Sequence, residues 1–388
     1  MKIAFIGQKG IPAISGGVEK HVEKLAVELV HQGHEVVCYV RSYYTPKALT
    51  NYQGVKLVHL PSIRTKHLDA ITHTLFASIH ALFADYDVIH YQSMGPATLA
   101  FIPRIFKRSA RTVATFHSRD YFHSKWGLFA RFFLKVAERL ILFVPERTFV
   151  VSETLAEYVR DTYGKECLVT QNGADVFYEC ETLPLASFGL KPKQYIVSVS
   201  RLLAHKGIHY LIKAFMDLED TNRLPGNNFK LAIVGAGVGT SEYEDYLKVL
   251  AKGRDSIVFL GERKGHELKA LFSQAAVFVQ PSEDEGLSIA LLEAMGHGLP
   301  CLVSNIPANL EAISDTGLNF ENKNVEDLKM ELSRLINTKE LMNDLGERAQ
   351  ERVAKQYSWE AIAKKTADAY VEEITRYAYK RYVAVLKS

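Results

Sequence analysis

The sequence is poor in cysteine and has no long apolar run. Four cysteines occur in 388 residues, at Cys38, Cys167, Cys180 and Cys301, and no two are spaced as Cys-x-x-Cys. This scarcity argues against a disulfide framework or a zinc cluster and favours a reducing, cytoplasmic setting. No run of about 18 or more uncharged apolar residues occurs, so no transmembrane helix is expected. The opening segment, MKIAFIGQKG, has too short an apolar stretch for a secretory leader and is predicted to be a buried strand.

Acidic residues are scarce in one part of the chain, although the whole carries a net charge of only +3. Residues 101–147 contain ten Lys and Arg against three Asp and Glu, a local net charge of +7, so the remainder carries −4. A basic patch confined to the N-terminal half predicts an anionic partner there.

The length and the composition predict two α/β domains. A chain of 388 residues with 47% hydrophobic residues can build more than one core. Short β-branched runs alternate with segments of helical period, which is the pattern of a doubly wound parallel sheet. The predicted strands of the first domain are 2–6, 35–40, 55–60, 88–91, 111–116 and 148–151, and those of the second are 195–199, 230–234, 256–260, 277–280 and 300–303.

The two domains are expected to divide at 184/185, because a stretch with Pro184, Gly189 and Pro192 precedes the second series of strands. The final segment, 359–386, is predicted to be helical, and its part from about 373 to 388 to pack back on the first domain. Ligands of open α/β sheets bind beyond the carboxyl ends of the strands. Functional residues are therefore sought directly after the predicted strands.

The loop after the first strand ends in Gly16-Gly17, where the first helix begins. Paired glycines let backbone amides approach a ligand, and the start of a helix favours anions. The alternative is a tight turn with a glycine cap. The loop lacks the GxGxxG spacing of a dinucleotide fold, which argues against NAD.

Arg201 and Lys206 follow the first strand of the second domain. An arginine fork and a lysine point charge in this position can straddle a diphosphate. The alternative is a pair of solvated surface cations. A nearby loop, Gly235-Ala-Gly237-Val-Gly239, imitates a nucleotide loop, but its glycine spacing is wrong and we expect no cofactor there.

Glu285 and Glu293 follow the strand that ends at residue 280 and are separated by seven residues. A helix predicted to start near Gly286 would place the two acids on the order of 10 Å apart along its axis. That separation exceeds the ~5 Å of a retaining glycosidase pair, so the two acids are expected to bind different parts of one extended ligand. The backbone amides of Gly286, Leu287 and Ser288 would hold a phosphate at the helix start.

This last string resembles the EX7E signature of retaining glycosyltransferases of the GT-B fold, specifically family 4. The resemblance covers nearly the whole chain. It includes Gly16-Gly17-Val-Glu near the start, Gln171-Asn172-Gly173-Ala-Asp175, the Arg201/Lys206 pair and the closing Tyr357-Ser-Trp359. The opening Gly7-Gln-Lys-Gly-Ile-Pro-Ala is similar to members that build bacterial surface polysaccharides.

The resemblance implies an acceptor-binding first domain, residues 1–184, and a nucleotide-sugar-binding second domain, residues 185–372. Arg201 and Lys206 match the basic pair that binds the donor diphosphate. Glu293 matches the acid at the ribose hydroxyls, and Glu285 the acid near the donor sugar. Gly17, next to Gly16, matches an amide that contacts the phosphate.

Other matches carry less of the resemblance. His117, at the end of a predicted strand, resembles a histidine near the donor sugar, and the alternative is a packing histidine. Glu262 and Arg263 occupy the place where backbone groups meet the base. Ser200 and Ser288 stand where many members have glycine, which leaves the identity of the donor open.

The resemblance implies metal-independent transfer to a saccharide or lipid-linked acceptor, because no DxD-like motif ends a strand. A stripe formed by Arg131, Lys135 and Arg139, within residues 125–139, predicts either contact with an anionic membrane or a solvated helix face. The peripheral location would be the inner face of the membrane. A catalytically silent scaffold, a nucleotide-sugar epimerase and a phosphorylase are the alternatives, and a nucleic-acid partner is not expected.

Overall fold

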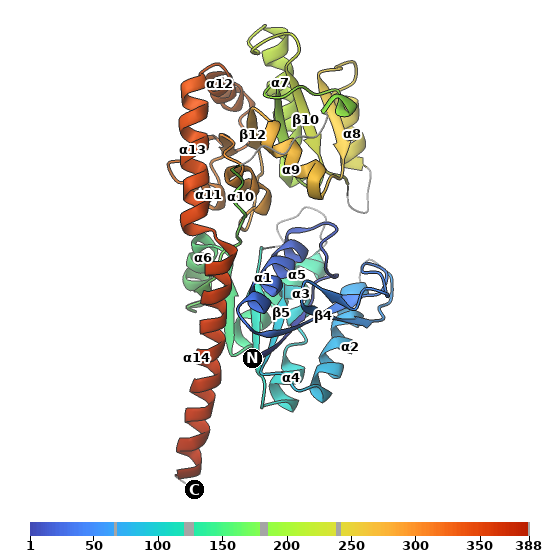
Figure 1. The fold of residues 1–388 in the computed structure, drawn as a ribbon, viewed down its shortest axis with the longest axis vertical. Helices are drawn as coiled ribbons and strands as arrows, with labels where there is room; N and C mark the ends of the chain where they lie inside the picture. The colour runs from blue at the N-terminus through green and yellow to red at the C-terminus, as the bar shows by residue number, and fades with distance from the viewer. Residues whose placement is uncertain (66–67, 120–127, 179–184, 238–241, 387–388) are drawn as a thin grey trace. The chain divides into compact units, whose positions relative to one another are not determined.

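The computed structural model describes residues 1–65, 68–119, 128–178, 185–237 and 242–386, with the backbone alone for 128–133 and 385. The chain forms two compact units, each an α/β body (Figure 1). Unit 1 comprises Met1–Asn172 and Trp359–Ser388, and unit 2 comprises Gly173–Ser358.

The units divide at 172/173 and 358/359. The sequence predicts instead a division at 184/185 and a return of the chain to the first domain near residue 373. Hydrogen bonding explains the first shift. The amide of Ala174 donates to the carbonyl of Tyr357 at 2.9 Å, and the amide of Phe177 donates to that of Gly296 at 3.0 Å. These bonds tie the segment after Asn172 to unit 2, well before the stretch that contains Pro184.

Unit 1 is built on an eight-stranded sheet in the order β3-β4-β2-β1-β5-β6-β7-β8, in which all pairs are parallel except β3 with β4. Its elements before the last helix are β1 (Lys2–Ile6), α1 (Gly17–His31), β2 (Glu35–Arg41), β3 (Asn51–Tyr52), β4 (Val55–Leu60), α2 (Asp69–Phe83), β5 (Val88–Gln92), α3 (Met94–Ala97), α4 (Phe101–Phe106), β6 (Arg111–Phe116), α5 (Leu128–Phe143), β7 (Arg147–Val150), α6 (Glu153–Tyr163) and β8 (Leu168–Val169).

Unit 2 is built on a six-stranded parallel sheet in the order β11-β10-β9-β12-β13-β14. Its main elements are β9 (Tyr195–Val199), α7 (Ile208–Asp220), β10 (Lys230–Val234), α8 (Glu242–Leu250), β11 (Ile257–Gly261), α9 (Gly265–Gln274), β12 (Val277–Gln280), α10 (Ile289–Gly296), β13 (Cys301–Ser304), α11 (Pro307–Ile313), β14 (Leu318–Phe320), α12 (Val325–Ile336) and α13 (Lys339–Gln356). The predicted class of two doubly wound parallel sheets is confirmed.

Runs of buried β-branched residues explain why the predicted strands agree so well with the structure. The run YIVSV of β9 is buried over its first four residues, and all four residues of β12 are buried. Sequence reasoning missed β3, β8 and β14, which are only two or three residues long. Segments that short show no period of two.

Each sheet has one point at which the order of its strands reverses. In unit 1 the chain passes from β1 to β2 and β4, then returns to place β5 on the other side of β1. In unit 2 it passes from β9 to β10 and β11, then places β12 on the other side of β9. The loops on the two sides of a reversal leave the sheet in opposite directions, which opens a crevice at the carboxyl ends of the strands.

The last helix, α14 (Trp359–Leu386), belongs to unit 1 and runs beside α1 (Figure 1). Its packing on unit 1 begins with the buried Trp359, earlier than the sequence predicts. The Tyr370 hydroxyl lies 2.6 Å from Nδ1 of His90 in the core of the sheet. Among the described residues, no helix combines the length and the apolar character needed to cross a bilayer.

Buried histidines are a feature of the unit 1 core. His21 lies 2.8 Å from the side-chain oxygen of Asn172 and meets the ring of Trp359 edge-on. Burial lowers the pKa of His21 to about 4 and that of His73 to about 4, and it holds the pKa of His90 well below the usual value. These rings are therefore neutral in the folded protein at neutral pH.

This burial predicts that unit 1 loses stability in mild acid. A histidine of the unfolded chain binds a proton as the pH falls below 6.5, whereas folded His21 binds one only near pH 4. Between these values each such histidine should remove up to about 1.4 kcal/mol of unfolding free energy per pH unit. Both tryptophans, Trp126 and Trp359, belong to unit 1, so urea unfolding followed by tryptophan fluorescence reports on this unit.

In the His21→Gln variant the slope of stability against pH should decrease by about the contribution of one histidine. His31→Gln, at an exposed position of the same helix, is the control and should leave the slope unchanged. An unchanged slope in His21→Gln would contradict the assignment of the acid sensitivity to buried rings.

Candidate active site

An ion pair joins the two loops at the strand-order reversal of unit 2. Lys206 closes a short 3-10 turn, Ala204–Lys206, in the loop after β9, and Glu285 lies in the loop after β12. The Lys206 Nζ lies 2.6 Å from Glu285 Oε1, with 13% and 11% of the two side chains exposed. Ser282 donates to the same carboxylate oxygen at 2.8 Å. The structure thus brings together two of the residues that the sequence singles out.

The same two loops touch through their backbones. The amide of Glu283 donates to the carbonyl of His205 at 2.7 Å. Gly207 has a φ of +68°, and a Cβ at this position would lie 1.9 Å from the carbonyl oxygen of Pro281. Only glycine allows this approach, so the position of Lys206 relative to Glu285 depends on a backbone contact as well as on the ion pair.

Arg201 lies at the start of the loop after β9 and is exposed. It forms no ion pair with any residue in the described part of the chain. The flanking backbone is held by the loop after β10, because Leu202 donates to the carbonyl of Ala236 and a Cβ on Gly235 would lie 1.8 Å from the Ser200 oxygen. The glycine at 235 thus has a packing role, and the Arg201 guanidinium is left to solvent.

A buried polar network holds the loop that carries Glu285. Asn309, on α11, donates to Ser304 and accepts from Gln280 Nε2 at 2.7 Å. Gln280, in turn, accepts from the Ser288 hydroxyl at 2.6 Å, and Ser304 donates to the carbonyl of Ser282. Gln280, Ser282, Ser304 and Asn309 are all at least 96% buried. The network therefore fastens both ends of the loop 281–288.

The helix that carries Glu293 begins three residues later than the sequence predicts. α10 starts at Ile289, and Ser288 caps it by accepting a hydrogen bond from the amide of Leu291 at 3.3 Å. Gly286 and Leu287 thus lie in the loop that precedes the helix, and Ser288 is its N-cap. Glu293 is partly buried on α10. The predicted roles of these residues toward a ligand remain predictions.

Glu262 and Arg263 follow the edge strand β11, two strand positions, or about 10 Å, from β9. Arg263 donates to the carbonyl of Leu260 at 2.8 Å, and its guanidinium lies 5.0 Å from the ring centroid of Phe188. Glu262 pairs with Lys264 at 3.6 Å. Both side chains are thus engaged within unit 2 and do not contact the Lys206–Glu285 pair.

In unit 1, His117 follows β6, and its Nε2 lies 2.8 Å from Oε1 of Gln92, at the end of β5. Its ring meets that of His21 edge-on at 4.9 Å. Burial, and then the nearby His21 and His90, hold the pKa of His117 well below its usual value. A neutral imidazole can hydrogen-bond a sugar hydroxyl, but it supplies no positive charge.

Gly16 and Gly17 precede and begin α1, and they differ in their surroundings. Gly16 has a φ of +101°, and a Cβ there would lie 2.2 Å from Glu19 Oε2, which packs under the loop. Glu19 also accepts from the amide of Lys9 at 3.1 Å. A Cβ on Gly17 would meet no described atom within 4 Å. The space over Gly17 is open, as the predicted approach of a ligand to its amide requires.

Sequence reasoning missed Ser282, Asn309, Gln92 and Glu19. The first two are ordinary polar residues, and nothing in their local pattern shows that they bond to the ends of one loop. Gln92 could have been found, because it directly follows the predicted strand 88–91. Glu19 could also have been found, because it lies in the first turn of α1, next to the paired glycines.

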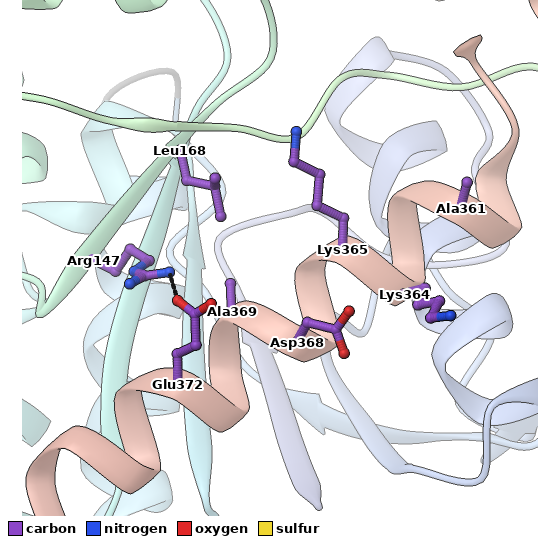
Figure 2. Close-up of a pocket in the computed structure, with 8 residues that line it drawn as sticks. All are labelled: Arg147, Leu168, Ala361, Lys364, Lys365, Asp368, Ala369 and Glu372. Atoms are coloured by element: carbon purple, nitrogen blue, oxygen red, sulfur yellow. Dashed lines mark hydrogen bonds and ion pairs between the residues drawn. The ribbon is translucent and has the colours of Figure 1, made fainter. Parts of the chain in front are cut away.

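A surface pocket of about 320 Å³ lies elsewhere, between α14 and strands β7 and β8 of unit 1 (Figure 2). Arg147 on its wall pairs with Glu372 at 2.8 Å. Its charged lining is mixed, with Lys364 and Lys365 beside Asp368. None of the predicted site residues lines this pocket. In the described part of the chain, no group of three or more His, Cys, Asp and Glu side chains is placed to hold a metal ion.

Two family models match the chain, one over most of unit 1 and the other over most of unit 2. The family model described as Glycosyltransferase Family 4 matches residues 15–176, and the model described as Glycosyl transferases group 1 matches residues 186–352. The chain is 29% identical to an uncharacterized glycosyltransferase, MJ1607, of Methanocaldococcus jannaschii over 95% of this chain and 98% of that protein. It is 32% identical to the putative colanic acid biosynthesis glycosyltransferase WcaL of Salmonella typhimurium, over 44% of this chain and 43% of the relative.

Solved structures resemble the chain over nearly its full length. The sucrose-phosphate synthase of Thermosynechococcus elongatus matches 97% of this chain and 99% of its own, at 20% identity and a TM-score of 0.81. Anabaena Alr3699/HepE, solved in complex with UDP and glucose, matches 96% and 100%, at 18% identity and a TM-score of 0.78. These likenesses establish the GT-B fold. With one family model over residues 15–176 and the other over residues 186–352, the chain belongs to the glycosyltransferases of group 1 and family 4.

Proposed function

We propose that this glycosyltransferase moves a sugar, with retention of its anomeric configuration, from a nucleotide-sugar donor to a hydroxyl of a saccharide or lipid-linked acceptor. The donor would bind at the carboxyl ends of β9 and β12 in unit 2, and unit 1 would bind the acceptor. The observation that carries the proposal is the Lys206–Glu285 pair at the strand-order reversal, with the exposed Arg201 on the same loop as Lys206.

The two cations would bind the donor diphosphate. An ammonium group has three donors, so Lys206 can keep Glu285 and still bind a phosphate oxygen. The Arg201 fork suits two oxygens of one phosphate. Both charges would offset the negative charge that develops on the diphosphate as the sugar–phosphate bond breaks. Preorganised electrostatic stabilisation of this kind is usually the largest single contribution to catalysis.

The two acids would bind hydroxyl groups at different parts of the donor. Glu285 would accept from hydroxyls of the sugar, and Glu293 from those of the ribose. Glu285 precedes α10, whereas Glu293 lies within it, at ~1.5 Å of rise per helical residue. This arrangement supports recognition of an extended ligand. The acceptor hydroxyl would then attack from the face that the diphosphate leaves, with His117 and the amide of Gly17 contacting the donor.

Two comparisons support the substrate classes. HepE was solved with UDP and glucose, which supports a nucleoside diphosphate sugar as the class of donor. The name of WcaL refers to colanic acid, which supports a role in the synthesis of a cell-surface polysaccharide or glycoconjugate. No comparison supports a silent scaffold, an epimerase or a phosphorylase.

We further propose a cytoplasmic enzyme that lies on the inner face of the membrane. The sequence predicts this contact through residues 125–139, of which 125–127 and the side chain of Arg131 lie outside the described residues. Lys135 and Arg139 are exposed on α5. Glu138 between them is buried and accepts from the Tyr158 hydroxyl at 2.7 Å. The contact through α5 remains a prediction.

The first test is to remove the charged groups of unit 2. After a panel of nucleotide sugars has identified the donor, Lys206→Ala, Arg201→Ala and Glu285→Gln should each lower the transfer rate by about 10²- to 10³-fold, because each removes a group placed at the reacting part of the donor. NMR of the wild-type product should show the anomeric configuration of the donor retained.

The matched control is Lys355→Ala, which breaks a Lys–Glu pair of 2.9 Å on the exposed face of α13. Its activity should remain within about twofold of wild type, because exposed pairs contribute little. Near-wild-type transfer by Lys206→Ala or Glu285→Gln would refute the proposed site.

A second test concerns the network that holds the Glu285 loop. Asn309→Ala removes the bonds to Gln280 and Ser304 and should lower kcat by about ten- to a hundredfold through misplacement of Glu285, with a smaller change in the KM for the donor. Asn309→Asp keeps the acceptor for Gln280 and should recover part of the loss. Asn305→Ala, which removes an exposed bond to the amide of Asn322, is the control. Equal activity of both alanine variants would exclude a positioning role for Asn309.

A third test concerns metal dependence. Exhaustive treatment with EDTA should leave at least about half of the activity, because Arg201 and Lys206 supply the positive charge that a metal ion supplies in other transferases. The control is readdition of Mg²⁺ or Mn²⁺. Complete loss with recovery on readdition would contradict the proposal.

A further inference from the structure

Helices α2 and α4 of unit 1 expose an unusual number of large apolar side chains. We call these residues, together with the cations beside them, the α2–α4 face. Phe83 is 86% exposed and Phe106 is 72% exposed. The two helices contact each other (Figure 1). Lys107 Nζ donates to the carbonyl of Leu82 at 3.2 Å, which joins the ends of the two helices. The apolar members of the face are Phe76, Ile79, Phe83, Phe101, Ile105 and Phe106.

The α2 helix buries small residues and exposes large apolar ones, the reverse of an ordinary surface helix. Small residues, among them Ala77, Ser78 and Ala81, are buried. The large residues Phe76, Ile79 and Phe83 follow the spacing of one helical stripe and point to solvent. A core-facing helix normally buries its large apolar residues. A contiguous exposed apolar patch of this kind indicates a binding surface.

Lys and Arg side chains border the α2–α4 face, and the segment of α4 and the residues after it, 101–111, contains no acid. Residues 101–111 contain four Lys and Arg and no Asp or Glu. Arg104 and Arg111 share Glu146, whereas Arg108 is exposed. In the loop that follows α2, Asp85 and Asp87 are exposed acids, and the four Lys and Arg of residues 101–111 outnumber these two.

The end of α14 contacts the segment that follows α4. The guanidinium of Arg111 lies 3.6 Å from the ring centroid of Tyr377 and donates to the carbonyl of Arg108, which links α14 to the segment after α4. Beyond this contact α14 runs on past the sheet of unit 1 (Figure 1). Tyr379 and Tyr382 are exposed there, and residues 374–386 contain three Lys and Arg and no acid.

We infer that the α2–α4 face, extended by the end of α14, docks onto an anionic lipid bilayer. Aromatic and aliphatic side chains enter the boundary between headgroups and acyl chains, tyrosines favour the headgroup level, and Lys and Arg attract anionic lipids. The charge pattern favours this occupant over a second copy of the chain, because two copies would bring like charges together. The inference differs from the sequence-based prediction, which places the contact on α5, and it does not depend on the proposed donor site.

Flotation with lipid vesicles tests the inference on the full chain. The wild-type protein should float with vesicles of phosphatidylglycerol and phosphatidylcholine in equal parts and should bind vesicles of phosphatidylcholine alone at least about tenfold more weakly, because the cations act on anionic headgroups. Phe83→Ser with Phe106→Ser should weaken binding at least about tenfold through the loss of inserted apolar area. Arg108→Glu with Arg381→Glu should have a similar effect.

Matched controls lie in unit 2. Val249→Ser with Met330→Ser removes two exposed apolar residues, and Lys252→Glu with Lys339→Glu reverses two exposed charges. Both pairs should bind vesicles like wild type. Tryptophan fluorescence verifies folding of the unit 1 variants, and circular dichroism verifies folding of the unit 2 variants.

Three outcomes would overturn the inference. The first is wild-type protein that binds neither kind of vesicle. The second is binding that is lost in Lys135→Glu with Arg139→Glu but kept in the variants of the α2–α4 face, which would assign the contact to α5. The third is a wild-type dimer in light scattering that becomes monomeric in Phe83→Ser with Phe106→Ser without a change in flotation, which would assign the face to a second copy.

Discussion

Strands β9 and β12 end side by side, and the loops that leave them go to opposite sides of the sheet. The candidate site depends on how closely these two loops approach. Gly207 passes the carbonyl of Pro281 at a distance that admits no side chain, and Glu283 bonds to His205. These backbone contacts place the residue before Gly207 next to a residue of the other loop. Lys206 and Glu285 are those residues, so the ion pair is a consequence of the topology and of one glycine.

The Lys206–Glu285 pair stabilises little on its own. Partly buried pairs lose in desolvation much of what they gain from attraction. The pair gains from Ser282, which satisfies a further site on the carboxylate, and from the network of Asn309, which holds the loop. A buried network that is fully bonded holds a unique geometry. We therefore see Asn309 as part of the site, although it bonds to Gln280 and Ser304 and not to Glu285 itself.

The sequence predicts most of the strands and the place of the site, for a physical reason. Buried β-branched runs have a strong local signal, and functional residues of such sheets follow strands. Arg201, Lys206 and Glu285 could be found in this way. The order of the strands, which makes β9 and β12 neighbours, is a long-range property, and so is the bond from Asn309 to Gln280. The start of α10 was missed because Ser288, two residues after Gly286, provides the cap.

The two units differ in the kind of polar group that they offer to a ligand. The histidines at the carboxyl edge of unit 1, His21 and His117, lie in surroundings that lower their pKa values, so they can donate or accept hydrogen bonds without carrying charge. Unit 2 presents permanent charges, because an arginine remains protonated in proteins and the Lys206 ammonium is held by a carboxylate. In the proposed site, the positive charge that would stabilise a departing diphosphate comes from Arg201 and Lys206 of unit 2, whereas the neutral rings of His21 and His117 in unit 1 would contribute hydrogen bonds alone. This difference in charge, rather than the fold that the two sheets share, supports the proposal that unit 2 binds the donor and unit 1 the acceptor.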